Sequence, residues 1–455
     1  MFKANRVHLA ALVFAACLTV FAQETRIPPV GPNPQAIAEI ASGARTVANA
    51  SWWGFNAEDA TDALQAAIDS PAKTVIVPYM GAPWIVRPIR LRGGLELVFD
   101  PGVLVLAKRG EFQGGGDSLF DAADAENITI RGYGATLRMW KKDYQNPPYK
   151  KAEWRMCIAI NGCKNVLIEG VRLESSGGDG FYIGATKGHP WCEDITIRNC
   201  VAKDHHRQGI SVISAQNLLV ENCEFSGTSG TAPQAGIDFE PNGPDERLVN
   251  CVVRNCVFQD NAGAAMQVYL KPLDSTSQPV SIRFENCVGR LGPAGASADD
   301  IRATGVKGHA GILVGAIRDD GPRGVVEFVN CVVENIGREA VSVYDKSATT
   351  AQVRFERCSW KSSWLAVAPD EAAGRAPLAI QRNRPSVAAI VGGIEFTDCV
   401  LHDDIDRPAL RVYGADDDHG VSRVSGVIWR SGPHTARADL GPNPKDSTLA
   451  VLALK

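Results

Sequence analysis

The sequence predicts an all-β protein that folds as a single-domain, right-handed parallel β-helix with an N-terminal capping helix. The first observation behind this prediction is a short alternating strand that runs into a turn residue and then a cysteine. It occurs seven times, ending at Cys200, Cys223, Cys256, Cys287, Cys331, Cys358 and Cys399. A strand and a polar turn that repeat every few tens of residues are typical of a solenoid. The scarcity of helical periodicity favours a solenoid built from strands.

The second observation is a constant offset from this turn to another strand. In four coils, a small residue opens a strand ten positions after the turn residue. The turn residue and the small residue are Gly170 and Gly180, Asn199 and Gly209, Asn255 and Ala265, and Asn330 and Ala340. In the coil of Asn222, the strand GIDFE begins at Gly236, so that coil carries four extra residues. A fixed offset of this kind predicts that equivalent residues stack on successive coils.

The residue types at the turn fit this stack. Asparagine and glycine tolerate the left-handed backbone conformation that a tight turn requires. Stacked asparagines are expected to form a hydrogen-bonded ladder. The cysteine that follows is expected to point inward as a buried thiol. The eleven cysteines after residue 22 form no pattern with zinc spacing, and their odd number does not suit a full disulfide framework.

The chain order predicts the remaining elements. Residues 1–22 read as a signal peptide, 23–50 as an N-terminal extension and 51–455 as the β-helix domain, with 51–80 as its cap. The segment DATDALQAAID at 59–69 is the one clear helix, and it suits the cap because a helix covers an open core. Short strands are expected over 74–78, 84–86, 89–91, 95–99 and 103–107. Residues 410–455 are expected to finish the last coil and cap it.

Charge and export signals limit the partners of this chain. The net charge of −4 argues against a nucleic-acid partner. The signal-peptide pattern predicts a periplasmic or secreted protein with no membrane span in the mature chain. Residues 140–155 (WKKDYQNPPYKKAEWR) form a basic and aromatic insertion that we expect to overhang a groove and to favour an anionic polymer.

A family resemblance supports the same fold. The stretch Trp53-Gly54-Phe55, followed by DATDALQAAID and TVIVP, resembles the N-terminal cap and first coils of pectate-lyase-like β-helix proteins. This superfamily includes polygalacturonase-type glycoside hydrolases, polysaccharide lyases and tailspike depolymerases, and the resemblance covers roughly residues 50–400. It implies a carbohydrate substrate. The polygalacturonase catalytic motifs are absent, so no catalytic residue is carried over from that group.

Strand alternation locates a candidate site on the outer face. It predicts one outward row of Tyr182, Ser211, Asp238 and Gln267, and a second row of Gly184, Ile213, Glu240 and Tyr269. Further polar residues flank the strands, with Asp179, His206 and Arg207 upstream and Lys271 downstream. The candidate catalytic residues are therefore Asp238, Glu240, Asp179 and His206. The candidate substrate-binding residues are Arg207, Tyr182, Gln267, Tyr269 and Lys271.

Three functions fit these residues. The first is a glycoside hydrolase in which Asp238 and Glu240, about 7 Å apart on one strand face, act as acid and base with inversion. The second is a polysaccharide lyase acting on a uronic-acid polymer, in which Arg207 or Lys271 neutralises the substrate and the acids hold Ca²⁺. The third is a binding or adhesion solenoid, in which the charges are a solvated strand face. The hydrolase needs no metal or other cofactor.

Overall fold

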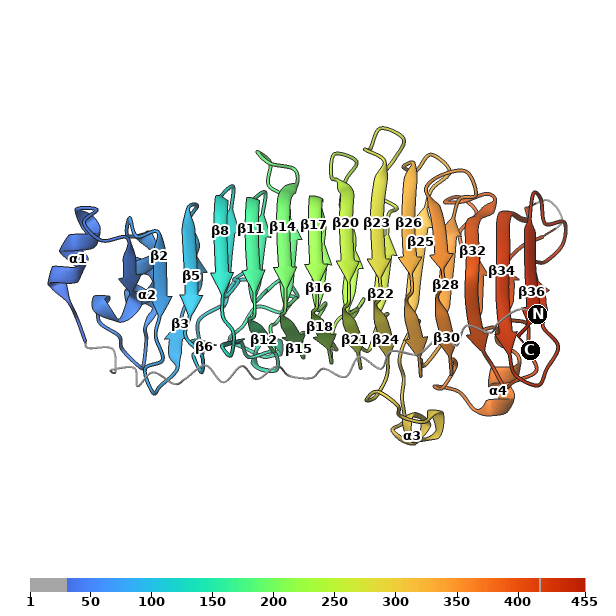
Figure 1. The fold of residues 1–455 in the computed structure, drawn as a ribbon, viewed down its shortest axis with the longest axis horizontal. Coiled ribbons are helices and arrows are strands. Elements are labelled where there is room, and N and C mark those ends of the chain that lie inside the picture. Colours follow the sequence, from blue (N-terminus) through green and yellow to red (C-terminus); the bar gives the residue numbers. More distant parts are fainter. Residues whose placement is uncertain (1–30, 417–418, 455) are drawn as a thin grey trace, which may run out of the picture.

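The computed structural model describes residues 31–416 and 419–454, which form one long parallel β-helix (Figure 1). The predicted signal peptide lies outside the described residues. Each coil contributes up to three strands, and every strand pairs in parallel with the equivalent strand of the next coil. The coils therefore stack along one axis, from α1 at one end of the rod to β36 at the other. The predicted fold class is confirmed.

Three strand stacks form the faces of the rod. The first, the site face, comprises β4 (Ile89–Arg90), β7 (Phe120–Ala123), β10 (Ile158–Asn161), β13 (Phe181–Gly184), β16 (Ile210–Val212), β19 (Ile237–Phe239), β22 (Met266–Tyr269), β25 (Ile312–Ile317), β28 (Val341–Lys346), β31 (Leu378–Gln381), β33 (Leu410–Tyr413) and β35 (Ala438–Asp439).

The second stack holds the longer strands. It comprises β1 (Val47–Asn49), β2 (Thr74–Val77), β5 (Leu95–Phe99), β8 (Glu126–Arg131), β11 (Lys164–Glu169), β14 (Cys192–Arg198), β17 (Ala215–Glu221), β20 (Leu248–Arg254), β23 (Val280–Glu285), β26 (Gly324–Val329), β29 (Gln352–Glu356), β32 (Val391–His402), β34 (Val421–Ser431) and β36 (Thr448–Ala453).

The third stack holds short strands that follow the asparagine turn. It comprises β3 (Trp84–Val86), β6 (Leu104–Ala107), β9 (Thr136–Arg138), β12 (Arg172–Glu174), β15 (Val201–Lys203), β18 (Glu224–Ser226), β21 (Val257–Gln259), β24 (Val288–Arg290), β27 (Val332–Glu334) and β30 (Ser359–Lys361). This stack joins the second one in β32, because that strand pairs with both β29 and β30.

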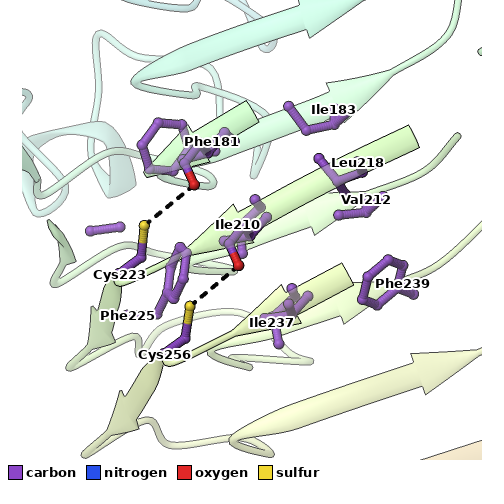
Figure 2. Packing of buried hydrophobic residues seen from close by; sticks show 14 of the residues in the cluster. Phe181, Ile183, Ile210, Val212, Leu218, Cys223, Phe225, Ile237, Phe239 and Cys256 are labelled. Carbon is purple, nitrogen blue, oxygen red and sulfur yellow. Dashed lines mark hydrogen bonds between the residues drawn. The ribbon is translucent and has the colours of Figure 1, made fainter. Parts of the chain in front are cut away.

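The core fills the interior of the rod. Alternate strand residues such as Ile210, Val212, Ile237 and Phe239 are fully buried, and the same positions repeat from coil to coil (Figure 2). Because strand side chains alternate between faces, the residues between them point away from this core. The burial of the core therefore fixes which residues face outward at the candidate site.

The predicted asparagine ladder is present. Asn199, Asn222, Asn255, Asn286 and Asn330 all have φ between 52° and 55°. Each later side chain donates its amide to the carbonyl oxygen of the preceding one, at 3.1–3.4 Å. The left-handed turn and the side-chain ladder therefore support each other from coil to coil.

The cysteines that follow these turns are buried free thiols, as predicted. The Sγ atoms of Cys223 and Cys256 donate to the carbonyl oxygens of Ile197 and Val220, at 3.8 and 3.7 Å (Figure 2). The expected stack on successive coils is also seen, since the backbone N–H of Cys200 donates to the Sγ atom of Cys223 at 3.4 Å.

Helices cover the N-terminal end of the rod. The expected capping helix is α2 (Thr61–Asp69); it starts two residues later than predicted because the Asp59 side chain accepts the backbone N–H of Thr61 and so forms the turn before it. A further helix, α1 (Pro34–Ala41), and strand β1 lie in the segment expected to be an extension. The structured part therefore begins before residue 51.

Other segments complete the fold. Helices α3 (Ala298–Ala303) and α4 (Pro369–Ala373) project from one side of the rod (Figure 1). The C-terminal residues after 410 add strands β33 to β36 to the stacks. Within residues 31–416 and 419–454, no helix has the length and apolar character needed to cross a membrane.

Candidate active site

Glycines at the starts of three strands let the coils approach closely at the candidate site. A Cβ atom on Gly180 or Gly236 would lie 2.6–2.7 Å from a carbonyl oxygen of the next coil, and one on Gly209 would collide in the same way. A larger side chain would therefore push these coils apart. The small residue that opens each strand in the sequence repeat has this packing role.

Strand register confirms the first predicted row. Tyr182 pairs with Ser211, Ser211 with Asp238, and Asp238 with Gln267. In the second row, Glu240 lies just beyond the end of β19, and its backbone N–H donates to the carbonyl oxygen of Val212 at 3.1 Å. Asp238 and Glu240 therefore lie two residues apart on one coil, as predicted.

Asp238 is held asymmetrically by two amide side chains. Its Oδ2 atom accepts a hydrogen bond from Gln208 Nε2 and another from Gln267 Nε2, each at 2.9 Å. Gln208 is fixed in turn, because its Oε1 atom accepts the backbone N–H of Ala235 at 3.0 Å. The Asp238 Oδ1 atom is buried and has no hydrogen-bond partner among the described residues. One oxygen is therefore free to carry or release a proton.

Arg207 lies between two other carboxylates. Its Nη1 atom is 2.6 Å from Glu240 Oε1 and 3.6 Å from Asp179 Oδ2. The same nitrogen is 3.4 Å from the Ser211 hydroxyl, which is itself 3.5 Å from Glu240 Oε1. We call Asp179, Arg207, Asp238 and Glu240 the acid cluster. It contains three carboxyl groups and one guanidinium.

Burial differs within the acid cluster. Asp179 and Asp238 are fully buried, whereas the side chains of Arg207 and Glu240 are 14 % and 18 % exposed. Asp238 therefore faces outward by register but is covered, which differs from the exposed face expected from alternation alone. The covering comes from neighbouring side chains, an effect that strand period does not describe.

Burial and crowding shift the protonation of the two covered acids. Burial, followed by the nearby Glu240 charge, raises the pKa of Asp238 well above its usual range, although Arg207 and Gln208 act against this shift. Burial also raises the pKa of Asp179 to about 7, opposed by Arg207. Burial lowers the pKa of Arg207, but Asp179 and Glu240 outweigh it and raise the pKa, so the guanidinium stays charged.

Tyr182 lies beside the acid cluster. Its ring covers Gly184, where a Cβ atom would collide with it. Burial, then the charges of Asp179 and Glu240, raise the pKa of the phenol to about 12. Tyr182 is therefore a neutral hydroxyl group beside the two acids, as a substrate-binding residue would be.

His206 does not join the acid cluster. Its Nε2 atom is 2.9 Å from the Thr231 hydroxyl, in the segment that carries the extra residues of this coil. Burial, followed by the Lys141 charge, lowers its pKa. The adjacent His205 is fully buried against Ser176, and burial lowers its pKa to about 3. The His206 ring therefore hydrogen-bonds Thr231 and, within the part of the chain that the structure describes, forms no ion pair with an acid.

Two other predicted residues, Tyr269 and Lys271, form no ion pair with the acid cluster among the described residues. Tyr269 is directed toward Arg384 and Tyr344, on later coils of the site face. Lys271 follows β22 in a turn and is partly exposed. That His206, Tyr269 and Lys271 share one substrate-binding patch with the acids stays a prediction, because no ion pair among the described residues joins them to the acid cluster.

The basic insertion 140–155 uses part of its charge internally. Lys141 Nζ pairs with Asp204 Oδ1 at 2.8 Å and donates to the Ser229 hydroxyl at 3.0 Å. Arg155 is fully buried and donates to the carbonyl oxygens of Phe112 and Lys150, at 2.8 and 2.6 Å. These two cations therefore hold the insertion against the rod, which leaves less charge for an anionic polymer than the sequence suggests.

Two site residues were not singled out in the sequence. Gln208 lies inside the segment Arg207–Ile210. The sequence feature that could have identified it is its position directly before Gly209, the small residue that opens a strand, as Asp179 lies directly before Gly180. Tyr344, in the strand AVSVY, lies over Gly315, and burial, Tyr269 and the Asp238 charge all raise its pKa. The sequence feature that could have identified Tyr344 is its outward position in β28, where it alternates with the buried Val343.

Within residues 31–416 and 419–454, no group of three or more His, Cys, Asp or Glu side chains is arranged to hold a metal ion. In the acid cluster, the position between Asp179 and Glu240 is occupied by the Arg207 guanidinium.

The comparisons with known proteins agree with this fold. The family described as the right handed beta helix region matches residues 150–288, which include the acid cluster. The SPbeta prophage-derived uncharacterized protein YorA of Bacillus subtilis is 29 % identical over 220 residues, covering 45 % of this chain and 36 % of the relative. The uncharacterized protein YclG of Bacillus subtilis is 31 % identical over 187 residues, which cover 38 % of this chain and 32 % of the relative. This chain thus matches about a third of each relative's length.

Solved structures with the same fold carry more specific names. The A-module of the mannuronan C-5 epimerase AlgE4 of Azotobacter vinelandii has a TM-score of 0.55 at 15 % identity, covering 89 % of this chain and 100 % of that one. A family 28 exopolygalacturonase of Yersinia enterocolitica has a TM-score of 0.53 at 13 % identity, and the match covers 90 % of this chain and 79 % of the exopolygalacturonase. A tailspike protein of E. coli bacteriophage HK620 in complex with a pentasaccharide has a TM-score of 0.56 at 13 % identity, covering 81 % and 63 %.

At these identities the likeness establishes the fold. The chain is a right-handed parallel β-helix protein, of the architecture shared by the epimerase module, the exopolygalacturonase and the tailspike. The resemblance to pectate-lyase-like β-helix proteins is confirmed at this level.

Proposed function

We propose that this protein is an exported glycoside hydrolase that degrades a polysaccharide. In this proposal Asp238 is the general acid, Glu240 the general base and Asp179 the residue that positions water. The observation that carries the proposal is the buried Asp238 carboxyl, whose Oδ2 is fixed by Gln208 and Gln267 while its Oδ1 has no partner. A carboxyl group that keeps its proton near neutral pH is what protonation of a glycosidic oxygen requires.

The two acids have environments that suit different roles. Burial raises the pKa of Asp238, whereas Glu240 is partly exposed and ion-paired with Arg207 at 2.6 Å. Glycosidases use one carboxyl group as acid and a second carboxylate to activate water or to attack the sugar. Their strand spacing of about 7 Å falls in the range of inverting enzymes, so we propose inversion.

The cover over Asp238 sets a condition for this mechanism. Arg207 and Glu240 are the partly exposed members of the acid cluster, and Arg207 also contacts Ser211 in the same row as Asp238. The proposal therefore requires the substrate to move the Arg207 side chain. Such movement would leave Glu240 free to act as the base.

The wider support comes from export and from fold. The signal-peptide pattern at 1–22 fits a protein whose substrate lies outside the cytoplasm. Proteins with the same fold include an exopolygalacturonase and a tailspike bound to a pentasaccharide. Function does not follow from fold alone, so these names support a saccharide substrate and leave the reaction to the acid cluster.

Elimination by a lyase is the second candidate, and Arg207 is the observation that favours it. A guanidinium at the surface of the cluster is able to neutralise the carboxylate of a uronic acid. In this structure, however, the guanidinium is engaged by Glu240 and lies near Asp179. A Ca²⁺ ion held by these acids would have to replace it. Hydrolysis requires only that the Arg207 side chain moves, and it needs no added ion.

One assay separates the three functions. The mature protein is incubated with a panel of acidic and neutral polysaccharides, and reducing ends and ultraviolet absorbance are recorded together. We expect new reducing ends without an unsaturated product. Absorbance from an unsaturated uronic acid would show elimination instead. No signal on any substrate that the protein binds would support an adhesion solenoid.

A further inference from the structure

A second candidate site lies on the surface where β26, β29, β32 and β34 begin. The recess there has a volume of about 300 Å³ and is lined by residues from four successive coils. Its polar lining includes Arg323, Arg423, Thr349, Thr350, Gln352 and Ser425. None of these residues belongs to the acid cluster, and the recess is not on the site face.

The charge in this recess is not balanced by the protein. Among residues 31–416 and 419–454, neither Arg323 nor Arg423 forms a salt bridge with a carboxylate. The acidic residue in the lining, Glu395, forms an ion pair with Arg354, whose Nε atom is 3.3 Å from Glu395 Oε2. Two guanidinium groups are thus available to a ligand.

A buried lysine lies behind the wall of the recess. Lys346 is fully buried, and its Nζ atom donates to the carbonyl oxygen of Gly393 at 3.2 Å. Gly393 lines the recess, has φ of +66°, and would collide with Nζ if it carried a Cβ atom. An ammonium group has three donors, so this contact leaves Lys346 poorly satisfied for a buried cation.

The surroundings of Lys346 favour its neutral form when no ligand is bound. Burial, followed by the charge of Arg423, lowers the pKa of Lys346 to about 7. The other charged groups of the recess are Arg323 and the paired Glu395. A negative charge placed in the recess would counter both the burial and the repulsion.

We propose that this recess binds an oxyanion, namely a carboxylate, sulfate or phosphate group, through the guanidinium groups of Arg323 and Arg423. Planar guanidinium groups match the geometry of such anions and form strong charge-assisted hydrogen bonds with them. The hydroxyl groups of Thr349 and Thr350 supply further donors. The site is independent of the proposed hydrolase activity, since it shares no residue with the acid cluster.

Binding at this site has a proton signature. Because a bound anion favours the ammonium form of Lys346, the protein takes up a proton when it binds near or above pH 7. Affinity therefore falls as the pH rises through this range. A surface pair of arginines without the buried lysine would bind without proton uptake.

The test is calorimetry on the folded mature protein at pH 7.5, in two buffers of different ionisation enthalpy. Inorganic sulfate and a free uronic acid serve as the two probes. Tighter binding of sulfate indicates a free inorganic oxyanion, and tighter binding of the uronic acid indicates an anion carried by a saccharide. We expect Arg423→Gln to weaken binding about 10- to 100-fold, the cost of losing one charged hydrogen-bond donor.

Lys346→Met tests the role of the buried lysine. It should remove the proton uptake and weaken binding, while Lys187→Met, at an exposed lysine elsewhere, should change neither. If Lys346→Met does not fold, Arg423→Gln still decides, because Arg423 is exposed. No heat with either probe, or unchanged affinity in the Arg323→Gln, Arg423→Gln double variant, would overturn the proposal. Failure of the polysaccharide assay would not affect it.

Discussion

Two buried aspartates on the site face, Asp179 and Asp345, differ sharply in how they are satisfied. Asp345, in β28, is fully buried; its Oδ1 accepts the backbone N–H groups of Asn383 and Arg384 at 2.7 Å, and its Oδ2 pairs with Arg384 Nε at 2.7 Å. Asp179, just before β13, is also fully buried. Neither of its oxygens has a hydrogen bond of good geometry, and its nearest cation, Arg207, is 3.6 Å away.

This difference supports a structural role for Asp345 and the role proposed for Asp179. A buried acid with several donors stabilises its surroundings and has no capacity left for a substrate. A buried acid without donors costs stability, and groups of this kind gather at sites of chemistry. Asp345 therefore has the contacts of a framework residue, whereas those of the acid cluster support the function proposed for it, although both lie on the same stack of strands.

The largest expected effect is loss of turnover in the acid cluster. Asp238→Asn and Glu240→Gln should each lower kcat by about 10²–10⁴-fold, because each removes a proton-transfer group with little change in shape. Substrate binding should change little. Single-turnover kinetics and calorimetric binding on the same polysaccharide measure the two quantities, with Asp345→Asn as the matched control.

Three results would change this assignment. Full activity in the Asp238→Asn, Glu240→Gln double variant would defeat both enzyme functions of the cluster. Greater damage from Arg207→Ala than from either acid substitution would favour the lyase, because the substrate carboxylate would lose its neutralising partner. A loss of kcat in Asp345→Asn as large as in Asp238→Asn would abolish the distinction drawn here between the two regions.

The next effect concerns the pH dependence of stability. The pKa of Asp179 is raised from 3.8 to about 7 in the folded protein. Between these values the folded state holds a proton that the unfolded state releases, so the stabilising contribution is complete below the unfolded pKa and is lost as the pH rises toward 7. Asp179→Asn should therefore gain more stability over wild type at pH 8 than at pH 4.

Urea denaturation of both proteins at the two pH values measures this difference. Asp238 contributes in the same direction, since its pKa is also raised, so some pH dependence should persist in the variant. Equal stability differences at pH 4 and pH 8 would mean that Asp179 titrates as an ordinary aspartate, and its contrast with Asp345 would then fail.

A smaller effect is expected at the satisfied aspartate. Asp345→Asn removes the ion pair with Arg384 and disturbs two backbone hydrogen bonds, which should cost about 1–3 kcal/mol of unfolding free energy. Arg384 is about two-fifths exposed, so solvent moderates the loss. Chemical denaturation gives the magnitude. An unchanged midpoint would show that the pair adds nothing to the framework.

Much of the fold was predictable because the repeat acts on the backbone. The turn residues need a left-handed conformation, and the constant offset from Gly170 to Gly180 and from Asn199 to Gly209 sets the spacing between the turn and the site-face strand. Strand period then placed Asp238 opposite Ser211 and Gln267, as the register shows. Helix α1 was missed because prolines at 28, 29, 32 and 34 make the stretch 23–50 look like an extension, although the helix itself, PQAIAEIA, is mostly alanine and isoleucine.

The site was less predictable because side-chain direction is not set by register. Arg207 reaches Glu240 as expected, whereas His206, its neighbour in sequence, turns to Thr231. Burial of Asp238 depends on side chains from adjacent coils, which strand alternation does not describe. Gln208 acquires its role from a contact with the next coil, so only the three-dimensional structure identifies it.

The smallest predicted effect lies in the asparagine ladder, far from any chemistry. Asn255→Ala should cost about 1–3 kcal/mol in unfolding free energy, from two lost ladder hydrogen bonds and from a left-handed backbone at φ of 54° that alanine disfavours. Asn255→Gly relieves the backbone strain but does not restore the hydrogen bonds, so it should recover part of the loss. Urea denaturation of both variants separates the two terms, and kcat should stay at the wild-type value. If glycine were as damaging as alanine, the ladder bonds would dominate; if activity fell with stability unchanged, the turn would belong to the site and not to the framework.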